Sequence, residues 1–174
     1  HQPARYLRKE FAVRKGVRRA TVYWSGLGLS ELYLNGRKVG DEQLSPALSY
    51  YPKRTFYVTH EVAQVLRPGT NAVGVVLGNG FYFSARSKAF CATRSFGFPK
   101  LLLQMHIEYE DGSQSEVLSD ETWKLTTNGP IRSNNDYDGE EYDARLELGR
   151  WDQPGYDDSR WQPVQRVASA GGAD

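Results

Sequence analysis

The sequence has little of what marks disulfide-linked, membrane-spanning or nucleic-acid-binding proteins. Its 174 residues include one cysteine, Cys91, so no internal disulfide can form. Cysteine usage therefore does not decide between an oxidising and a reducing compartment. No apolar run approaches the ~20 residues that span a bilayer. The formal net charge is +1, which provides no overall field to attract a polyanion. We therefore expect neither a membrane nor a nucleic acid as a partner.

One short segment is locally basic in spite of this balance. It holds Arg14, Lys15, Arg18 and Arg19. No aromatic residues that could stack on bases alternate with them, so the segment predicts a solvated turn and not a nucleic-acid site.

The usual catalytic and metal-binding motifs are also missing. The three histidines are His1, His60 and His106, and the sequence has no nucleophile elbow to accompany them. Cys91 follows Phe90 in an aromatic-rich segment, which is typical of a small packing residue and not of a nucleophile. Zinc-ligand spacing is absent, and GLGLSELYLNG lacks the third glycine of a phosphate-binding loop. The sequence therefore predicts no catalytic residue, no metal site and no cofactor.

Short strand-like runs between turn signals dominate the chain. Hydrophobic residues make up 39% of it, and its length suffices to bury roughly 70% of the unfolded surface. Repeated short strands separated by Gly, Pro, Asn and Asp favour an all-β antiparallel sandwich or barrel over a parallel α/β sheet. The predicted strands span residues 6–13, 20–24, 31–34, 55–58, 71–77, 100–109, 115–118 and 122–125.

One segment, HEVAQVLRPGTN at residues 60–71, has the spacing of a short helix of about two turns. Val62, Val65 and Leu66 recur at helical intervals before a Pro-Gly pair ends the pattern. Such a helix commonly covers one open end of a β-sandwich. Val62 and Leu66 are therefore predicted core residues.

The stretch ELYLNGRKVGD, residues 31–41, predicts a tight hairpin. Its Asn35-Gly36 pair tolerates the two positive φ angles of a type I′ turn. The two-residue loop sets a register that pairs Leu32 with Val39, Tyr33 with Lys38 and Leu34 with Arg37.

A second hairpin is predicted within residues 101–125. A two-residue loop would place Ile107 opposite Glu116, which is a poor pair. A three-residue loop at 111–113, with Gly112 in the left-handed region, places Ile107 opposite Val117 instead. We expect this second register.

The acidic segment NNDYDGEEYDAR, residues 134–145, resembles a calcium loop only in part. Asn134, Asp136 and Asp138, followed by a glycine, match the opening of an EF-hand loop. The twelfth position, however, holds Arg145 where a bidentate glutamate belongs. An EF-hand site is therefore not expected, and a looser calcium site stays open without support.

The same carboxylates could instead serve a glycosidase as acid and base. That chemistry needs two carboxyl groups facing each other across roughly 5–9 Å, whereas Glu140 and Glu141 would point apart on a strand. We favour a polar segment that meets a neighbouring domain or a substrate entrance. Its candidate residues are Asp136, Asp138, Glu141 and Asp143.

The glycine-flanked stretch LGNGFYF, residues 77–83, is the candidate for sugar binding. Glycines permit close approach, aromatic rings stack on the C–H faces of a sugar, and polar side chains bind its hydroxyls. The candidate residues are Asn79, Phe81, Tyr82 and Arg86. The competing interpretation, in which these aromatics pack the end of the sandwich or the next domain, stays open.

These segments in their order resemble the N-terminal β-sandwich domain of bacterial α-L-rhamnosidases. The resemblance is carried by GLG…ELYLNGRKVGD, YVTHEVAQVLRPGTNAVGVVLGNGFY, FPKLLLQMHIEYEDGSQSEVLSDETWKL, YDGEEYDARLE and GRWDQPGYDDSRWQP, and it covers nearly the whole chain. It implies a jelly-roll fold similar to galactose-binding domains. Phe81 stands where the family usually has tryptophan, so a sugar platform there would be smaller.

The resemblance also implies that the chain is part of an enzyme and not the enzyme. Residues 1–174 are expected to form a single domain, a fragment of a larger multidomain glycosidase that hydrolyses terminal rhamnose in a separate (α/α) barrel. The start, HQPARYL, lacks a signal-peptide pattern, and we interpret both ends as cut points. The expected partners are that barrel and a rhamnose-containing glycan or glycoside.

Two roles are compatible with this resemblance. The domain could be a non-catalytic scaffold for the barrel, with a share in substrate recognition. The alternative is an autonomous carbohydrate-binding module for rhamnose or a related sugar. Some related modules bind rhamnose with calcium, but their ligands have no residue-by-residue match here. The bacterial compartment, cytoplasmic or periplasmic and secreted, stays open.

Overall fold

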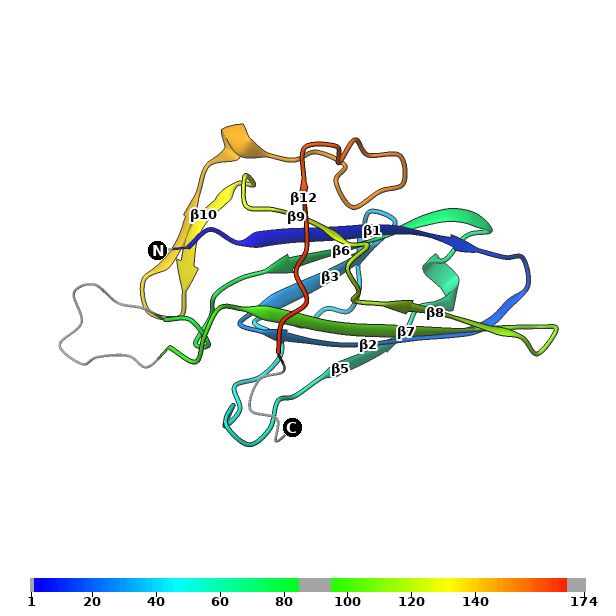
Figure 1. The fold of residues 1–174 in the computed structure, drawn as a ribbon, viewed down its shortest axis with the longest axis horizontal. Helices are drawn as coiled ribbons and strands as arrows, with labels where there is room; N and C mark the ends of the chain where they lie inside the picture. The colour runs from blue at the N-terminus through cyan, green and yellow to red at the C-terminus, as the bar shows by residue number, and fades with distance from the viewer. Residues whose placement is uncertain (1, 85–94, 169–174) are drawn as a thin grey trace.

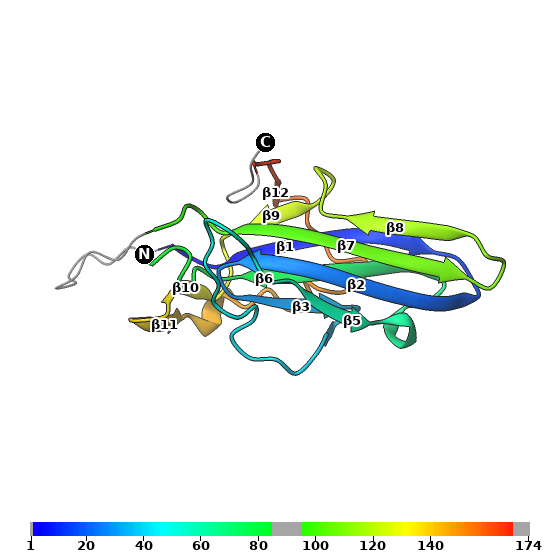
Figure 2. The same ribbon diagram turned by 90° about the horizontal axis from the view of Figure 1, so that it is seen from below.

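The chain folds as two antiparallel sheets packed face to face, with a small hairpin at one end (Figures 1 and 2). The computed structural model describes residues 2–84 and 95–168. The larger sheet has six strands in the order β12-β9-β1-β6-β3-β4, and the smaller has four in the order β5-β2-β7-β8. This confirms the expected jelly-roll β-sandwich.

The chain crosses between the two sheets several times, and β3 with β4 and β7 with β8 form hairpins within one sheet. Their bounds are β1 (Arg5–Val13), β2 (Val17–Leu27), β3 (Ser30–Leu34), β4 (Arg37–Lys38), β5 (Val58–Glu61), β6 (Gly69–Leu77), β7 (Lys100–Tyr109), β8 (Gln114–Leu118), β9 (Lys124–Thr126), β10 (Ile131–Asn135), β11 (Gly139–Tyr142) and β12 (Gln162–Pro163). Strands β10 and β11 form the separate hairpin.

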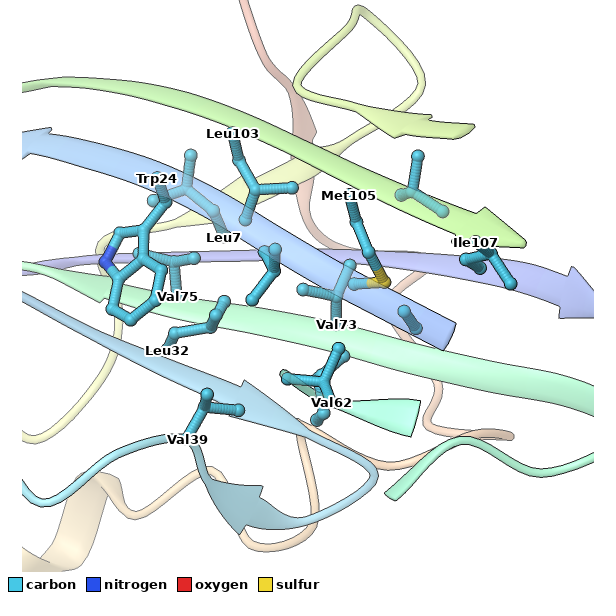
Figure 3. Close-up of a cluster of buried hydrophobic side chains, with 14 of the residues drawn as sticks. Leu7, Trp24, Leu32, Val39, Val62, Val73, Val75, Leu103, Met105 and Ile107 are labelled. Carbon is cyan, nitrogen blue, oxygen red and sulfur yellow. The ribbon is translucent and has the colours of Figure 1, made fainter. Parts of the chain in front are cut away.

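The core lies between the two sheets, as Figure 3 shows. On β7 the inward side chains of Leu103, Met105 and Ile107 are buried, while the alternating Leu102 and Gln104 are exposed, as the period of two requires. Full burial of such a side chain contributes about 1.5–3 kcal/mol. The core side chains labelled in Figure 3 are Leu7, Trp24, Leu32, Val39, Val62, Val73, Val75, Leu103, Met105 and Ile107.

The hairpin of β3 and β4 has the predicted turn and register. Asn35 has φ 52° and Gly36 has φ 82°, the two positive angles of a type I′ turn. Tyr33 pairs with Lys38 and Leu34 with Arg37, and the amide of Val39 donates to Leu32 O at 2.8 Å. The prediction is confirmed.

The register predicted for the second hairpin is wrong by two residues. Strand β7 sets Ile107 opposite Ser115, and Val117 pairs with Met105. The loop has three residues, but it begins at Glu110 because the amide of Tyr109 donates to Ser113 O at 2.9 Å. Gly112, at φ 80°, is therefore the last loop residue, the position of the left-handed residue in a three-residue hairpin.

Several predicted boundaries are also corrected. The strand predicted at 55–58 lies at Val58–Glu61, and the one at 122–125 lies at Lys124–Thr126. The predicted helix at 60–71 is reduced to the 3₁₀ turn η1 (Ala63–Val65), because Val62 donates to Ala20 O and so continues the pairing of β5 with β2. Val62 is buried and Leu66 packs against the same cluster, as expected.

Helical structure is minor in the described residues. A second 3₁₀ turn, η2 (Ala144–Leu146), was not predicted. Neither turn, nor any other helix of the described residues, has the length and apolar character needed to cross a membrane.

The segment of residues 144–161 covers the outer face of the six-stranded sheet. The ring of Trp151 stacks beside Trp161 at 6.2 Å and meets Tyr6 edge-on at 5.3 Å. It lies so close to β6 that a Cβ on Gly74 would stand 2.6 Å from the indole. Glycine in the middle of this strand is thus required by the packing of Trp151.

A buried arginine fastens this covering segment to β1. Arg8 is 1% exposed, and it donates to the carbonyl oxygens of Trp151 at 2.9 Å and Gln153 at 3.1 Å. Its guanidinium also pairs with Glu10 at 2.7 Å and with Asp158.

Asp158 is held in its charged form at this junction. Burial opposes ionisation of its carboxyl group, but the hydrogen bond from Lys124 and the charge of Arg8 outweigh burial. The pKa of Asp158 therefore lies below its usual value. A dense network of ion pairs thus joins the last third of the chain to its first strand.

Candidate functional site

The structure brings the predicted sugar-binding residues and the predicted acidic residues to one end of the sandwich. The backbone amide of Asn79 donates to Asn134 Oδ1 at 2.6 Å, and Asn79 Nδ2 donates to Asn134 O at 2.9 Å. The rings of Phe81 and Tyr137 lie 6.4 Å apart. The loop after β6 and the β10–β11 hairpin therefore form one surface, which we call the hairpin end and define as residues 78–84 and 131–143.

Asn79 joins three segments of protein at the hairpin end. Its side chain is buried, with Oδ1 accepting from Arg5 Nη1 at 2.6 Å and Nδ2 donating to Gln2 O at 2.7 Å. Burial also lowers the pKa of Arg5. The close approach that glycine permits here is between protein segments, since a Cβ on Gly78 would lie 2.8 Å from Asn134 Oδ1.

The two aromatic candidates differ in their access to solvent. Tyr82 is buried, with its ring 4.9 Å from Tyr51 and 6.0 Å from Phe96, and burial raises its pKa. Phe81 is half-buried at the margin of the same cluster, between Phe96 and Tyr137. Tyr82 therefore packs the sandwich end, and Phe81 is the one that reaches the surface. The remaining candidate, Arg86, lies outside the described residues.

Three of the four acidic candidates are engaged in local structure. Glu141 accepts from the Ser133 hydroxyl at 2.9 Å, and Asp138 accepts from Asn135 Nδ2 at 2.9 Å. Asp143 caps η2, and hydrogen bonds from Arg145 lower its pKa. These carboxylates hold the hairpin and the turn after it in shape.

Asp136 differs from the other three. It lies at the tip of the β10–β11 hairpin, where partial desolvation raises its pKa. Burial, together with the negative charge of Asp136, also raises the pKa of Tyr51, a member of the aromatic cluster. Asp136 follows Asn135 and precedes Tyr137, whose ring lies 6.4 Å from that of Phe81.

The hairpin end therefore offers groups of the kinds that bind sugars. Phe81 and Tyr137 supply rings, and Asp136 supplies an acceptor. Nδ2 of Asn134 is a buried donor with no hydrogen-bond partner among residues 2–84 and 95–168. Within the same ranges, no group of three or more His, Cys, Asp or Glu side chains gathers closely enough to hold a metal ion.

Some members of the aromatic cluster at the hairpin end were not identified from the sequence. Tyr51, Phe96 and Tyr137 join it from three separate segments, and only the surplus of aromatic residues hinted at them. The hairpin itself had a local signal, the Asp138-Gly139 pair, where Gly139 has φ 76°.

Two surface cavities lie away from the hairpin end. The larger, of about 400 Å³, lies between β1 and the covering segment, where Lys9, Lys124 and the buried Arg8 are paired with acidic neighbours. The smaller, of about 210 Å³, lies on the outer face of the four-stranded sheet beside Tyr23 and His106. Neither cavity is lined by a residue predicted to bind sugar.

Comparison with known proteins places the chain among domains of larger enzymes. Residues 15–173 match the family model of the α-L-rhamnosidase N-terminal domain. An α-L-rhamnosidase of Formosa agariphila is 45% identical over 169 residues, which are 95% of this chain and 18% of that protein. The chain thus spans about one fifth of the length of this relative.

Solved structures agree with the sequence match. An α-L-rhamnosidase from Dictyoglumus thermophilum superposes with a TM-score of 0.88 at 43% identity, covering 98% of this chain and 18% of that one. The α-L-rhamnosidase of Streptomyces avermitilis, solved in complex with L-rhamnose, gives a TM-score of 0.89 at 38% identity, covering 96% of this chain and 16% of that one.

Proposed function

The chain belongs to the α-L-rhamnosidase N-terminal domain family, and from this we propose that residues 1–174 are one non-catalytic domain of a longer α-L-rhamnosidase. In that enzyme the domain supports the catalytic (α/α) barrel, which hydrolyses terminal rhamnose. The observation that carries the proposal is the extent of the match, nearly the whole of this chain against about one fifth of each full-length relative.

The arrangement of the carboxylates supports a non-catalytic role. Hydrolysis of a glycoside needs two carboxyl groups that face each other across the substrate. Glu141 and Asp138 are instead bound to Ser133 and Asn135 of their own hairpin. Their hydrogen bonds hold the hairpin in shape.

The test uses the full-length enzyme and an aryl rhamnoside that releases p-nitrophenol. A general acid or base contributes about 10²–10⁴-fold to the rate. We expect Asp138→Asn and Glu141→Gln to change kcat by less than about 10-fold, because neither carboxylate takes part in bond cleavage. A hundredfold loss of kcat in either variant, with the fold intact by circular dichroism, would refute the non-catalytic role.

A second function, rhamnose binding by this domain itself, is supported by the composition of the hairpin end. Phe81, Tyr137 and Asp136 combine rings with an acceptor, and the Streptomyces avermitilis relative was solved with L-rhamnose. Asn79 and Tyr82 would act in this function by holding the site, since their side chains are buried.

Titration with L-rhamnose, with and without calcium, tests this second function. We expect chemical-shift changes at Phe81 and Tyr137 that saturate with sugar and disappear in Tyr137→Ala. The matched control is Tyr57→Ala, an exposed tyrosine outside the hairpin end. A spectrum that stays unchanged under both calcium conditions would exclude sugar binding and leave the scaffold role.

A further inference from the structure

The two outer faces of the sandwich differ in whether another segment of the chain covers them. The six-stranded sheet is covered by residues 144–161, with Trp151 packed onto Gly74. The outer face of the four-stranded sheet, which we call the open face, carries exposed apolar side chains instead. Leu102 on β7 is 70% exposed and Leu118 on β8 is 41% exposed. Soluble proteins rarely leave neighbouring large apolar groups uncovered unless something binds them.

The register of the strands places these two side chains in neighbouring rows of the sheet. Leu118 lies opposite Gln104, and Gln104 lies opposite Tyr23, so the three form a row across β8, β7 and β2. The next row toward the start of β7 contains Leu102, which lies opposite Ser25. The ring of Tyr57, which is exposed, lies 6.2 Å from that of Tyr23 and extends the apolar surface to the edge of β5.

The other half of the open face is charged. Further along the same strands His106 pairs with Glu116 at 2.9 Å, and Arg19 pairs with Glu61 at 3.0 Å. Next to them Arg18 pairs with Glu108 at 2.6 Å. An apolar region with paired charges beside it has the apolar core and polar rim typical of a protein–protein interface. Aliphatic side chains such as Leu102 favour a protein surface over a sugar.

The course of the chain brings its last described residues to the apolar half. After β12, which pairs with β9 at the edge of the six-stranded sheet, the chain runs along the side of the sandwich toward the level of the four-stranded sheet (Figure 1). There Lys100 Nζ donates to Ala168 O at 2.8 Å. Lys100 begins β7, two residues before Leu102. Residue 168 thus lies beside the apolar half of the open face.

We propose that the open face is the surface against which the part of the enzyme that follows residue 174 packs. The inference rests on the proposed function, in which this chain is one domain of a longer α-L-rhamnosidase. The relatives supply the length of chain required, since the matched region is only 18% of the Formosa agariphila protein. The hydrogen bond from Lys100 to Ala168 shows that the chain reaches the open face at its last described residues. The exposed side chains of Leu102, Leu118 and Tyr23 form the apolar surface there.

The test measures cysteine labelling in the full-length enzyme. Leu102→Cys and Leu118→Cys are reacted with a maleimide, each labelled site is identified by peptide mass spectrometry, and each rate is compared with that of the same protein in urea. The matched control is Leu146→Cys in η2, a leucine 37% exposed on the opposite side of the sandwich. We expect residues 102 and 118 to react at least ~10-fold more slowly in the native enzyme, and residue 146 to react at close to its urea rate.

The other occupants of this face are distinguished by the same assay. Labelling of residues 102 and 118 as fast as in urea would overturn the proposal. Protection that disappears on hundredfold dilution would indicate a second copy of the chain, and protection that needs added L-rhamnose would indicate a sugar; both results overturn it. Protection that is independent of concentration and of sugar supports it.

Activity of the same proteins separates this inference from the proposed function. An enzyme that hydrolyses the aryl rhamnoside while residue 102 labels freely would disprove the docking surface and leave the function intact. An enzyme that is inactive toward the rhamnoside while residue 102 is protected would disprove the function and leave the docking surface intact.

Discussion

Replacing Arg8 with alanine tests how the covering segment is held on the six-stranded sheet. The side chain is 1% exposed and is bound to the carbonyl oxygens of Trp151 and Gln153 and to the carboxylates of Glu10 and Asp158. Its removal leaves the buried Trp151 carbonyl without this donor. It also opens a cavity where the guanidinium lay.

The expected loss follows from what the partners can still do. Removing one member of a buried ion pair costs about 3–5 kcal/mol. Asp158 keeps its pair with Lys124 at 2.5 Å, and Glu10 still accepts from the amide of Gly155 at 2.8 Å. Since both carboxylates retain a partner, we expect Arg8→Ala to lower the free energy of unfolding by about 3 kcal/mol, near the lower end of that range.

Urea unfolding followed by tryptophan fluorescence measures this loss, because Trp151 and Trp161 lie in the covering segment. The matched control is Arg18→Ala, since Arg18 also forms one short ion pair, with Glu108, but its side chain is 66% exposed. An exposed pair contributes only about 0–1 kcal/mol. Equal losses in the two variants would refute the view that burial of Arg8 is what fastens the segment.

Four further predictions concern pH, two glycines and Asn79. The pKa of Asp158 is lower in the folded chain than in the unfolded chain. Its ionised carboxylate therefore stabilises the fold above the unfolded pKa of ~3.9, and this stabilisation is lost as the pH falls through the folded pKa. In urea unfolding between pH 5 and 2, the free energy of unfolding of Asp158→Asn should therefore depend less on pH than that of the unsubstituted protein. Gly112→Ala should cost about 1–2 kcal/mol from its φ of 80° alone, since no atom lies within 4 Å of the new Cβ. Gly74→Ala should cost about 1–3 kcal/mol by displacing the indole of Trp151 and should change the near-UV circular dichroism, which Gly112→Ala should leave unchanged. Asn79→Ala should lower the free energy of unfolding by about 2–3 kcal/mol in the same urea assay, and a loss below 0.5 kcal/mol would contradict its buried joining role.

Features decided by neighbouring residues could be predicted from the sequence. The β3–β4 hairpin needs only the positive φ angles of Asn35 and Gly36 and the alternation around them. The prediction of the β7–β8 register failed because a shift of two residues keeps every side chain on its own face of the sheet. Ile107 faces the core in either register, so the hydrophobic pattern could not choose between Ser115 and Val117 as its partner.

Features decided by distant partners could not be predicted. Strand β5 begins at Val58 because its pairing partner is Trp24 of β2, which no local propensity at 55–58 contains. The predicted helix was lost for the same reason, since pairing with β2 extends through Val62.

The candidate site follows the same division. Local composition identified Asn79, Phe81 and Asp136 as polar and aromatic residues in turns. Their common location depends on contacts such as that between Asn79 and Asn134, which are 55 residues apart. Buried asparagine at such a junction is recognised only when the three segments that it joins, its own included, are seen together.

The position of β1 in the middle of the six-stranded sheet has a consequence for biogenesis. Both of its hydrogen-bonded neighbours, β6 and β9, are translated after it. At ~5–20 residues per second, β1 leaves the ribosome several seconds before β6 and longer still before β9. During that interval a nascent chain carries a central strand with both edges unpaired, so ribosome-bound chains ending before Gly69 should be the ones that chaperones and proteases engage.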